Sequence, residues 1–446
     1  MERTHTFTAQ TLTAHGMKPG RWANRFATAG LTALLLTGCA SPGDAKPPVS
    51  EVKAEPTPAQ TTQSFSEWLA GVRTEAMRQG IRSRTVDLAF ANARILDRVL
   101  ELDNSQPEFS RPIWTYLDSA VSEQRVIAGS KQLKASAGLL ARVSAEYGVP
   151  KEILIAFWGV ESDYGQSYGD WSVVNSLATL AYKSRRPAYF RSELLAALRI
   201  LDNKDISLAQ MRGSWAGAMG QTQFMPTIFL KHAIDYDRDG RRDIWNSLPD
   251  VFASTANFIV TGNGWRRDES WGEEVRVSRD FPWDQAELTI VKPVSEWVQI
   301  GVRPVGGGAL ADYGSASVLA PAGHTGPVFL VRENFRSIMR YNPSTSYALA
   351  VALLADRMKG GGHVVAGWPR GESPLSGSER LELQQKLAAS GFDPGSTDSL
   401  VGPATRSAIR GFQKTIGEVP DGFATKRLLE SLRQRQIMPR IGPGAS

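Results

Sequence analysis

One glutamate, Glu161, stands within the run FWGVESDYGQSYG, residues 157–169, after a series of aromatic and aliphatic side chains. Pro150 suits the first turn of a helix, and the residues after it favour helix. Leu154, Trp158 and Glu161 would then share one helical face. An apolar setting raises the pKa of a carboxyl group, which suits a glutamic acid that donates a proton near neutral pH. On spacing alone, a solvated or arginine-paired glutamate is the alternative.

A second acidic group lies in DYDRDGRRDIWN, residues 235–246, which has the aspartate spacing and central glycine of a calcium-binding EF-hand loop. Asn246 stands where such loops usually carry a glutamate, and a later aspartate would close a longer loop. The expected ligands are Asp235, Asp237, Asp239, the carbonyl of Arg241, and Asp250. The calcium ion would be structural, with no cofactor required for chemistry. The alternative is a charged turn held by arginines, namely Arg238, Arg241 and Arg242.

The elements that carry these groups are mainly helical. From Phe65 to about Gly272, segments such as RSELLAALRILDN place apolar residues at three- and four-residue spacing. The stretch 273–330 is richer in Trp, Val, Gly and Pro, which predicts a small β-rich insertion. Helical periodicity returns near Asn334. This order predicts one α+β domain, mainly α, rather than two separate domains.

Three separated motifs carry a family resemblance. Glu161-Ser162 with Tyr164-Gly165, then GSWAGAMGQTQFMPT (213–227) and RYNPSTSYALAV (340–351), closely resemble the membrane-bound lytic murein transglycosylase B family. The resemblance spans roughly 65–359. It implies a lysozyme-like fold in which Glu161 is the sole catalytic acid and base, acting on the glycan strands of peptidoglycan.

The same resemblance implies the remaining site residues. It places Ser214 and Gln223 at the active site, and Tyr341 and Asn342 near the bound glycan, with a tyrosine hydroxyl beside Glu161 to orient it. Gly217 and Gly220, lacking side chains, would allow a sugar ring to approach the backbone. This set predicts a substrate groove built around one carboxyl group.

One carboxyl group is enough for cleavage without water. Glu161 would protonate the oxygen between N-acetylmuramic acid and N-acetylglucosamine, and then accept the proton of the sugar's own 6-hydroxyl as it closes onto C1. The product is a 1,6-anhydromuramyl end. The enzymatic alternative is a hydrolytic muramidase with Asp163 as second carboxylate, although two helical residues so spaced point apart. The nonenzymatic alternative is a peptidoglycan-anchoring lipoprotein.

The C-terminal segment predicts a small three-helix module. ERLELQQKLAASGF, GPATRSAIRGFQKTIG and DGFATKRLLESL are amphipathic and joined by Gly, Pro and Asp turns. GPATRSAIRGFQ and DGFATKRLL resemble the peptidoglycan-binding type 1 domain, which implies noncatalytic attachment to the wall. Tethering such a module would raise the effective substrate concentration at the enzyme.

The N-terminal segment carries a targeting signal. Arg21 and Arg25 precede the apolar stretch FATAGLTALLLTG, and LTGC ending at Cys39 resembles a bacterial lipobox. That resemblance implies diacylation of Cys39 and removal of the residues before it; an ordinary signal peptide with an incidental cysteine is the alternative. Ala40 after the cysteine favours sorting to the outer membrane. Translation from Met17 would give a more compact signal than translation from Met1.

These observations divide the chain into a lipoprotein signal peptide (1–38), a tether (39–63), a catalytic domain (64–360), a linker (361–376) and a peptidoglycan-binding domain (377–434). The expected location is the outer membrane of a Gram-negative bacterium, facing the periplasm. The expected partners are peptidoglycan and, through Cys39, the membrane, and further cell-wall enzymes are left open. The formal charge of +6 is a weak bias, and with no recognisable module for it nucleic acid is not expected.

Overall fold

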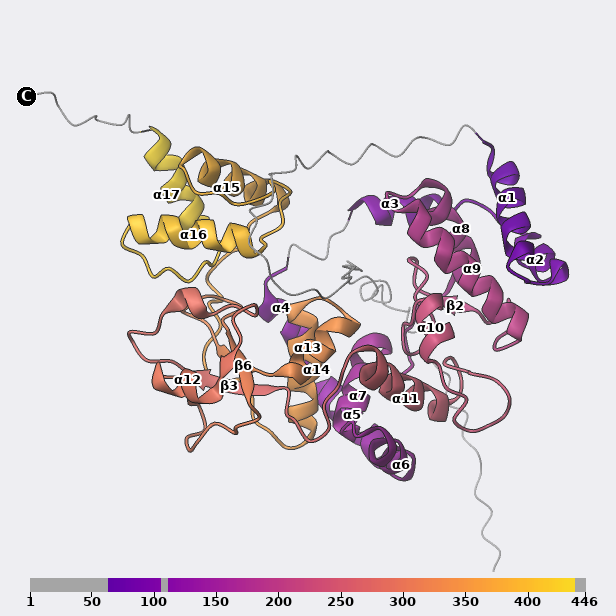
Figure 1. The fold of residues 1–446 in the computed structure, drawn as a ribbon, viewed down its shortest axis with the longest axis horizontal. Helices are drawn as coiled ribbons and strands as arrows, with labels where there is room; N and C mark the ends of the chain where they lie inside the picture. Colours follow the sequence, from indigo (N-terminus) through magenta and orange to yellow (C-terminus); the bar gives the residue numbers. More distant parts are fainter. Residues whose placement is uncertain (1–62, 106–110, 438–446) are drawn as a thin grey trace, which may run out of the picture.

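The computed structural model describes residues 63–105 and 111–437, so the predicted signal peptide and Cys39 lie outside the described residues. The described chain forms two groups of helices, a small sheet and a C-terminal helical module (Figure 1). Within those residues, every helix is too short or too polar to cross a membrane. The predicted class, a mainly α lysozyme-like domain with a β-rich insertion, is confirmed.

The first helical group packs around a core that includes Trp68, Leu177, Leu194 and Phe229. Helices α8 and α9 pack closely against each other within it. The group consists of α1 (Phe65–Arg78), α2 (Ser83–Phe90), α3 (Asp97–Ser105), α8 (Val173–Lys183), α9 (Pro187–Asn203) and α10 (Pro226–His232). The short strands β1 (Trp171–Ser172) and β2 (Arg212–Gly213) pair beside it.

The second helical group surrounds α7 (Lys151–Ser162), whose residues from Ile153 to Gly159 are all buried. A helix that is apolar on every side belongs in the middle of a core. The helices around it are α4 (Ile113–Ala120), α5 (Glu123–Ala135), α6 (Ala137–Tyr147), α11 (Leu248–Asn257), α13 (Glu333–Tyr341) and α14 (Thr345–Met358). A single π-helical turn, Phe258–Gly262, follows α11.

The predicted β-rich insertion is an antiparallel sheet of five strands in the order β4-β6-β7-β3-β5. The central strands pair in register, with Glu273 opposite Leu330. The strands are β3 (Gly272–Arg276), β4 (Lys292–Pro293), β5 (Arg303–Pro304), β6 (Ser315–Leu319) and β7 (Val328–Val331), with α12 (Val294–Gln299) across them. Trp297 of α12 is fully buried among the sheet side chains, so the insertion has its own small core.

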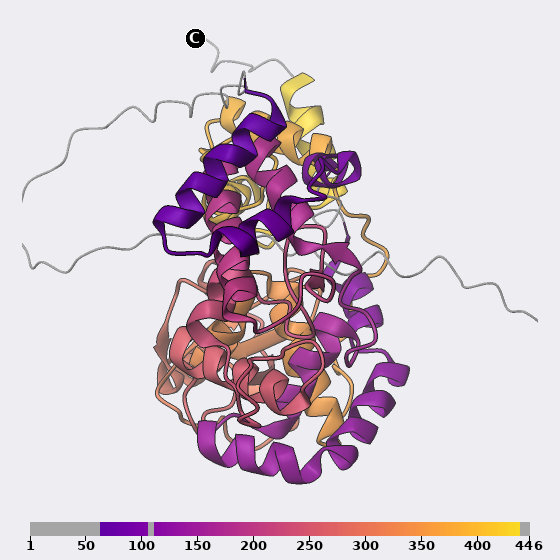
Figure 2. The same cartoon turned by 90° about the vertical axis from the view of Figure 1, so that its right-hand side faces the viewer.

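The C-terminal module consists of α15 (Gly377–Ala389), α16 (Pro403–Thr415) and α17 (Lys426–Ile437). Leu387, Ile409, Phe412 and Leu428 fill its core, as their helical spacing predicted. In Figure 2 the yellow module lies at the upper end of the molecule, and the purple helices near residues 120–150 lie at the lower end.

The module is held against the β-insertion by buried charges. Both Arg406 and Arg410 of α16 bind Glu287, at 2.7 and 2.6 Å. His324 Nδ1 lies 2.6 Å from a carboxylate oxygen of Asp421, which also accepts the His324 backbone N–H at 2.9 Å. Burial alone would raise the pKa of Glu287, but the two arginines together hold it below its ordinary value. Glu287 is therefore the charge at the centre of the contact.

Glu287→Ala should loosen the module, because it leaves Arg410 buried without its carboxylate. Removing one member of a buried ion pair costs about 3–5 kcal/mol, and we expect proteolysis of the linker at 361–376 to accelerate accordingly. Glu382 is the matched control: it pairs with Arg433 on the module surface, where both side chains are partly exposed, and Glu382→Ala should cost under about 1 kcal/mol. Equal cleavage rates for the two variants would contradict this role of Glu287.

Candidate active site

Helix α7 brings Glu161 to the site and then ends abruptly. It starts after Pro150, and it stops because Asp163 and Tyr164 adopt left-handed backbone angles, φ 49° and 59°. Tyr164 folds back over Gly159, where an added Cβ would lie 2.7 Å from the tyrosine ring. Gly159 is therefore a packing residue in the last turn, and it allows the sharp stop that leaves Glu161 at the helix end.

The carboxyl group of Glu161 sits in a setting that disfavours its charge. The residue is half-buried, and burial of its carboxyl group raises the pKa of Glu161 to about 8. The hydroxyl of Tyr347 donates a hydrogen bond to Glu161 Oε1, which opposes part of that rise. Burial and the nearby charge of Glu161 also raise the pKa of Tyr347 and of Tyr116. At neutral pH the glutamic acid is therefore mostly protonated and has a hydroxyl partner.

The tyrosine beside Glu161 is Tyr347, a residue that was not singled out from the sequence. Tyr341, the expected candidate, donates its hydroxyl to the Thr222 carbonyl at 2.5 Å. Its ring stacks on Tyr347 at 6.4 Å and contacts Phe157 of α7 at 4.7 Å. Tyr341 thus packs behind the residue that makes the contact. The signal for Tyr347 was its place in the first turn of a helix following the RYNPS motif.

The segment 213–227 folds against α7 through Gln221, which sequence reasoning also missed. Trp158 Nε1 donates to Gln221 Oε1 at 2.7 Å, and Gln221 Nε2 donates to the Trp245 carbonyl at 2.6 Å. All three residues are buried. Gln221 therefore joins the catalytic helix to both loops that follow it in the chain.

Ser214 and Gln223 lie in the tight turns of this segment. Ser214 is 2% exposed, and its hydroxyl accepts the Ala218 N–H at 3.1 Å. Gln223 has φ 51°, and its side-chain nitrogen donates to the carbonyls of Gly220 and Tyr168, at 2.8 and 3.0 Å. Both side chains therefore hold the loop in shape, with the Gln223 amide nitrogen already engaged.

The expectation that two glycines leave room for a sugar is wrong for this structure. A Cβ on Gly217 would lie 2.3 Å from Leu177, and one on Gly220 would lie 2.7 Å from the Ile244 carbonyl. Both also have positive φ, 92° and 58°. The absent side chains leave space for protein atoms, so these glycines serve backbone shape and packing.

Asn342 follows α13 and presents an unusual buried atom. Its Oδ1 is enclosed without a hydrogen-bond partner in the described part of the chain. Buried amide oxygens are nearly always bonded, so this one is an exception among the described residues. This is the feature that keeps Asn342 among the candidate ligand contacts.

A cavity of about 650 Å³ lies beside the loop that follows Glu161. Its walls combine hydroxyl, amide, carboxylate and guanidinium groups with aromatic rings, as a saccharide site requires. The polar and aromatic walls include Tyr168, Asp170, Trp171, Asn175 and Arg212. The loop 165–172, which follows α7, therefore lines a polar depression.

The acidic loop brings together three of the five predicted metal ligands. Carboxylate oxygens of Asp235, Asp237 and Asp250 all lie within 4.8 Å of one another. Asp239 instead turns outward to Arg241, at 2.9 Å. Asp250 is fully buried, and burial is the main reason that its pKa rises to about 6, although backbone N–H groups of neighbouring residues lower it.

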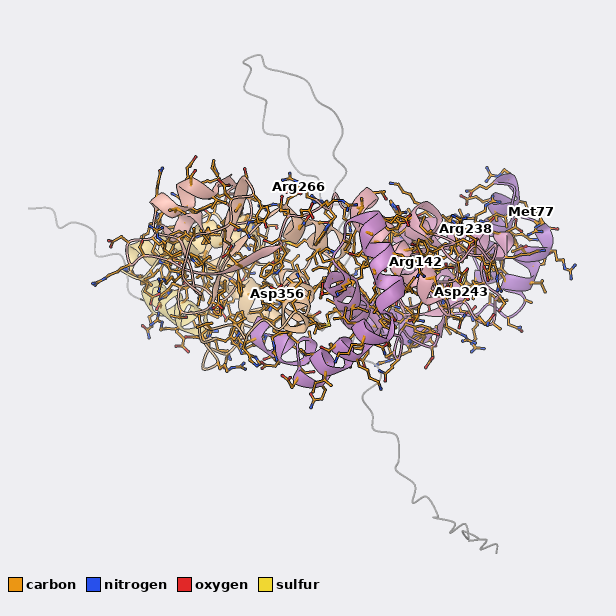
Figure 3. The ribbon with its side chains drawn as sticks, turned by 90° about the horizontal axis from the view of Figure 1, so that it is seen from below. Met77, Arg142, Arg238, Asp243, Arg266 and Asp356 are labelled. Atoms are coloured by element: carbon orange, nitrogen blue, oxygen red, sulfur yellow. The ribbon has the colours of Figure 1, made fainter. Side chains whose placement is uncertain are left out.

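Figure 3 shows where this loop lies in the molecule. Arg238 and Asp243 lie toward the same end as Met77 of α1, whereas Asp356 of α14 lies nearer the other end. Asp243 is occupied as a turn acceptor, binding the backbone N–H groups of Trp245 and Asn246 at 2.9 Å each. Clustered carboxylate oxygens are the type of ligand that Ca²⁺ takes.

Asp163 is the candidate second carboxylate of the hydrolytic alternative, and it is paired with an arginine. Its carboxylate pairs with Arg125 at 3.3 Å, and its side chain is 47% exposed. It caps α7 in a left-handed conformation, which aspartate tolerates. The Asp163 carboxylate is therefore engaged by an arginine at the surface.

Comparison with known proteins agrees with this geometry. A family model for the transglycosylase SLT domain matches residues 64–356, and one for a peptidoglycan binding domain matches 376–432. Membrane-bound lytic murein transglycosylase B of Escherichia coli is 30% identical over 287 residues, which is 61% of this chain and 77% of that protein.

Two solved structures extend the comparison. SltB3 from Pseudomonas aeruginosa, in complex with NAG-anhNAM-pentapeptide, is 49% identical with a TM-score of 0.81, covering 83% of this chain and 100% of that one. Slt35 of Escherichia coli, in complex with calcium, is 26% identical with a TM-score of 0.58, covering 67% of this chain and 93% of that one.

The fold and these matches define an enzyme of the lytic transglycosylase class that acts on peptidoglycan. The chain belongs to the transglycosylase SLT domain family and carries a C-terminal peptidoglycan binding domain.

Tyr347→Phe should raise the pKa of Glu161 above its value of about 8, because the lost hydroxyl hydrogen bond favoured the ionised carboxylate. Infrared titration of the carboxyl band, assigned by comparison with Glu161→Gln, would measure the shift. Tyr341→Phe is the control, since that hydroxyl binds a carbonyl, and it should leave the titration nearly unchanged. An unchanged pKa in Tyr347→Phe would contradict the assigned contact.

Proposed function

We propose that this lytic transglycosylase cleaves the β-1,4 bond between N-acetylmuramic acid and N-acetylglucosamine without water, using Glu161 alone. Glu161 protonates the leaving oxygen, and the muramyl 2-acetamido group stabilises the cation that develops at C1. The ionised Glu161 then accepts the proton of the 6-hydroxyl as that oxygen bonds to C1. The products are a free 4-hydroxyl and a 1,6-anhydromuramyl end.

The observation that carries this mechanism is the environment of Glu161. A carboxyl group with a pKa of about 8 starts the reaction protonated, and the Tyr347 hydroxyl stabilises the carboxylate formed after proton transfer. The same group therefore has support in both roles. The hydrolytic alternative needs a second carboxylate to activate water, and its candidate, Asp163, is paired with Arg125.

We further propose where the glycan lies. Asn342, through its unpartnered Oδ1, is the candidate acceptor for a substrate amide or hydroxyl. Ser214, Gln223 and Tyr341 contribute mainly by fixing the groove wall, since each is engaged within the protein. The depression beside 165–172 would hold sugars further along the strand. Among the alternatives, a purely anchoring protein leaves the protonated glutamate without a use.

A structural calcium ion is proposed for the acidic loop, held by Asp235, Asp237 and Asp250. Their clustering supports it, as does the calcium complex of the related Slt35. Bound Ca²⁺ would supply charge neutralisation for these carboxylates and no step of the reaction. The backbone carbonyl of Arg241 stays a proposed ligand, while the Asp239 carboxylate is directed to Arg241.

Attachment to the membrane is proposed through diacylated Cys39, with sorting to the outer membrane and the catalytic domain facing the periplasm. The support is the lipobox-like LTGC sequence with Ala40 after it, together with similarity to a relative named as membrane-bound. Two acyl chains provide the stable anchoring that one chain does not. The chain from Cys39 to Gln63 would serve as the tether.

Glu161→Gln should lower turnover of purified sacculi by at least about 10²–10⁴, the contribution usual for general acid–base catalysis. The amide keeps the shape and loses the proton, so binding to sacculi should persist. Asp163→Asn is the matched control, because asparagine tolerates the same backbone conformation, and it should retain activity. Chromatography of released muropeptides measures both. Activity lost with Asp163→Asn and kept with Glu161→Gln would reverse the assignment.

Calcium should stabilise the native chain against heating, since an ion that binds only the folded state shifts unfolding by about 2.7 kcal/mol at one hundred times its Kd. Asp235→Asn should abolish this calcium-dependent rise in Tm, whereas Asp239→Asn should preserve it. Differential scanning calorimetry with calcium or with chelator provides the comparison. A Tm that ignores calcium in the native chain would refute the metal site.

Cys39→Ala should prevent lipidation, so the precursor remains uncleaved or mislocalised, whereas a chain that begins after Cys39 should be soluble and active. Membrane fractionation with a labelled lipid precursor distinguishes these products. Outer-membrane sorting of mature Cys39→Ala protein would remove lipidation from the account, and an inner-membrane native protein would remove the sorting proposal alone.

A further inference from the structure

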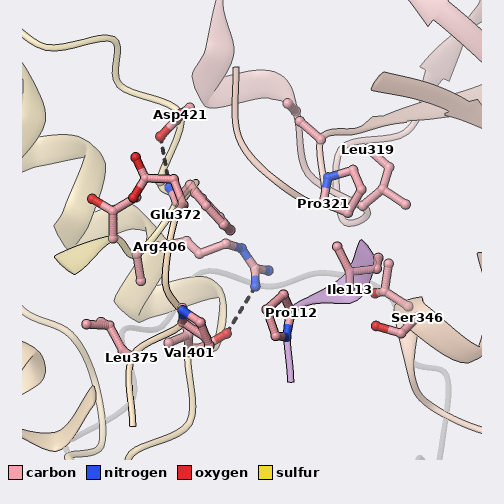
Figure 4. A pocket seen from close by; sticks show the side chains of 18 of the residues that line it. Pro112, Ile113, Leu319, Pro321, Ser346, Glu372, Leu375, Val401, Arg406 and Asp421 are labelled. Carbon is pink, nitrogen blue, oxygen red and sulfur yellow. Dashed lines mark hydrogen bonds between the residues drawn. The ribbon is translucent and has the colours of Figure 1, made fainter. Parts of the chain in front are cut away.

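A second cavity, of about 330 Å³, lies between the C-terminal module and the catalytic domain. Figure 4 shows Arg406 reaching from the module toward Pro112, with Leu319, Pro321 and Ser346 on the opposite wall. The lining combines the start of α4, the start of α14, two loops of the β-insertion, the linker and the module. The cavity therefore exists only while the module is docked through Glu287 and Asp421.

The charged groups of this cavity include an excess of positive charge. Glu287 is shared by Arg406 and Arg410, so two guanidinium groups face one carboxylate. Arg380 also lines the cavity, and it donates to the carbonyl oxygens of Ser399 and Leu375, at 2.8 and 2.7 Å. A ligand that brings its own carboxylates is favoured by such a lining.

The whole lining carries four arginines, Arg111, Arg380, Arg406 and Arg410, against the three carboxylates of Glu287, Glu372 and Asp421. One oxygen of Asp421 accepts from Gln413 and the Phe423 N–H, at 2.8 and 2.9 Å. The other accepts two donors of His324. Both Asp421 oxygens therefore already hold donors of the protein. Glu372, on the linker, remains in the lining as an acidic group that suits an ammonium partner.

The remaining walls of the cavity are apolar and are formed by separate aliphatic side chains. Ile113, Leu319, Ala320 and Leu375 present small aliphatic surfaces rather than a flat aromatic platform of the kind on which sugar rings stack. Methyl-sized groups fit such walls better than a pyranose does. Carboxylates, one ammonium group and alanine methyls occur together in the peptide stems attached to peptidoglycan.

We propose that this cavity between the module and the catalytic domain binds a peptide stem of peptidoglycan, with Arg111 and Arg380 of the lining facing its carboxylates. This inference rests on the proposed function, and it names the part of the substrate that the docked module recognises. The related SltB3 was crystallised with ligands that carry a pentapeptide stem.

Two of the helices that line the cavity also carry tyrosines that surround Glu161. Ile113 and Trp114 line it from the first turn of α4, which also carries Tyr116. Thr345 and Ser346 line it from the first turn of α14, immediately before Tyr347. Two helices therefore lead from the cavity to the tyrosines around Glu161, so that a bound stem would lie beside the strand being cleaved.

A matched pair of variants tests the site. Ala320→Glu places a carboxylate in the cavity, and Ala320→Gln adds the same bulk without charge. Ala320 takes no part in the docking ion pairs. The probes are a synthetic sugar-free stem pentapeptide and an N-acetylglucosamine tetramer, titrated calorimetrically into the full mature chain. The glutamate variant should weaken pentapeptide binding about tenfold through like-charge repulsion, the glutamine variant much less, and tetramer binding should be equal in all three proteins.

Absence of pentapeptide binding by the native chain, or equal weakening by both variants, would overturn the proposal. Ser373→Glu and Ser373→Gln, on the exposed linker, repeat the test if the Ala320 variants fail to fold. Turnover of stem-free glycan strands is measured in parallel because it reports on Glu161 chemistry alone. It should be equal in all of these proteins, so a failure of the stem site is distinguishable from a failure of the proposed function.

Discussion

Burial of one carboxyl group is the constraint on which the rest of the structure depends. Ionising Glu161 in this setting is costly, and its pKa of about 8 expresses that cost. The setting needs a helix that is apolar on all sides, and α7 is such a helix. It also needs α14 packed against α7, so that the Tyr347 hydroxyl reaches the carboxyl group. The surrounding helices hold these two in place.

Local patterns were enough to predict most of the elements, whereas the choice of Glu161 as catalytic residue came from the family resemblance and stays a prediction. The apolar stripe before Glu161, the change of composition at 273–330 and the three amphipathic segments at the C-terminus each depend on neighbours in sequence. Their outcome in the structure follows from periodicity and turn chemistry. Asp250 was named as a ligand by analogy with the loop of the resembling family, and its carboxylate does lie with those of Asp235 and Asp237.

Contacts between distant segments could not be read in this way. Tyr347 lies 186 residues from Glu161 in the chain, and only the packing of α13 and α14 decides that it, rather than Tyr341, makes the contact. Gln221 joins Trp158 and Trp245, which lie 63 and 24 residues from it in the chain. The glycines at 217 and 220 were misread since sequence does not show which atoms occupy the space beside a missing side chain. The ion pairs of Glu287 belong to the same class of contact.

In the proposed mechanism no water attacks C1, and isotopic labelling tests that claim most directly. Sacculi digested by the native chain in water enriched in heavy oxygen should yield 1,6-anhydromuramyl ends that carry none of the label, as measured by mass spectrometry. The oxygen that bridges C1 and C6 would then have come from the sugar's own 6-hydroxyl. Reducing muramic ends that carry the heavy isotope would contradict the account, because they would show that water attacked C1.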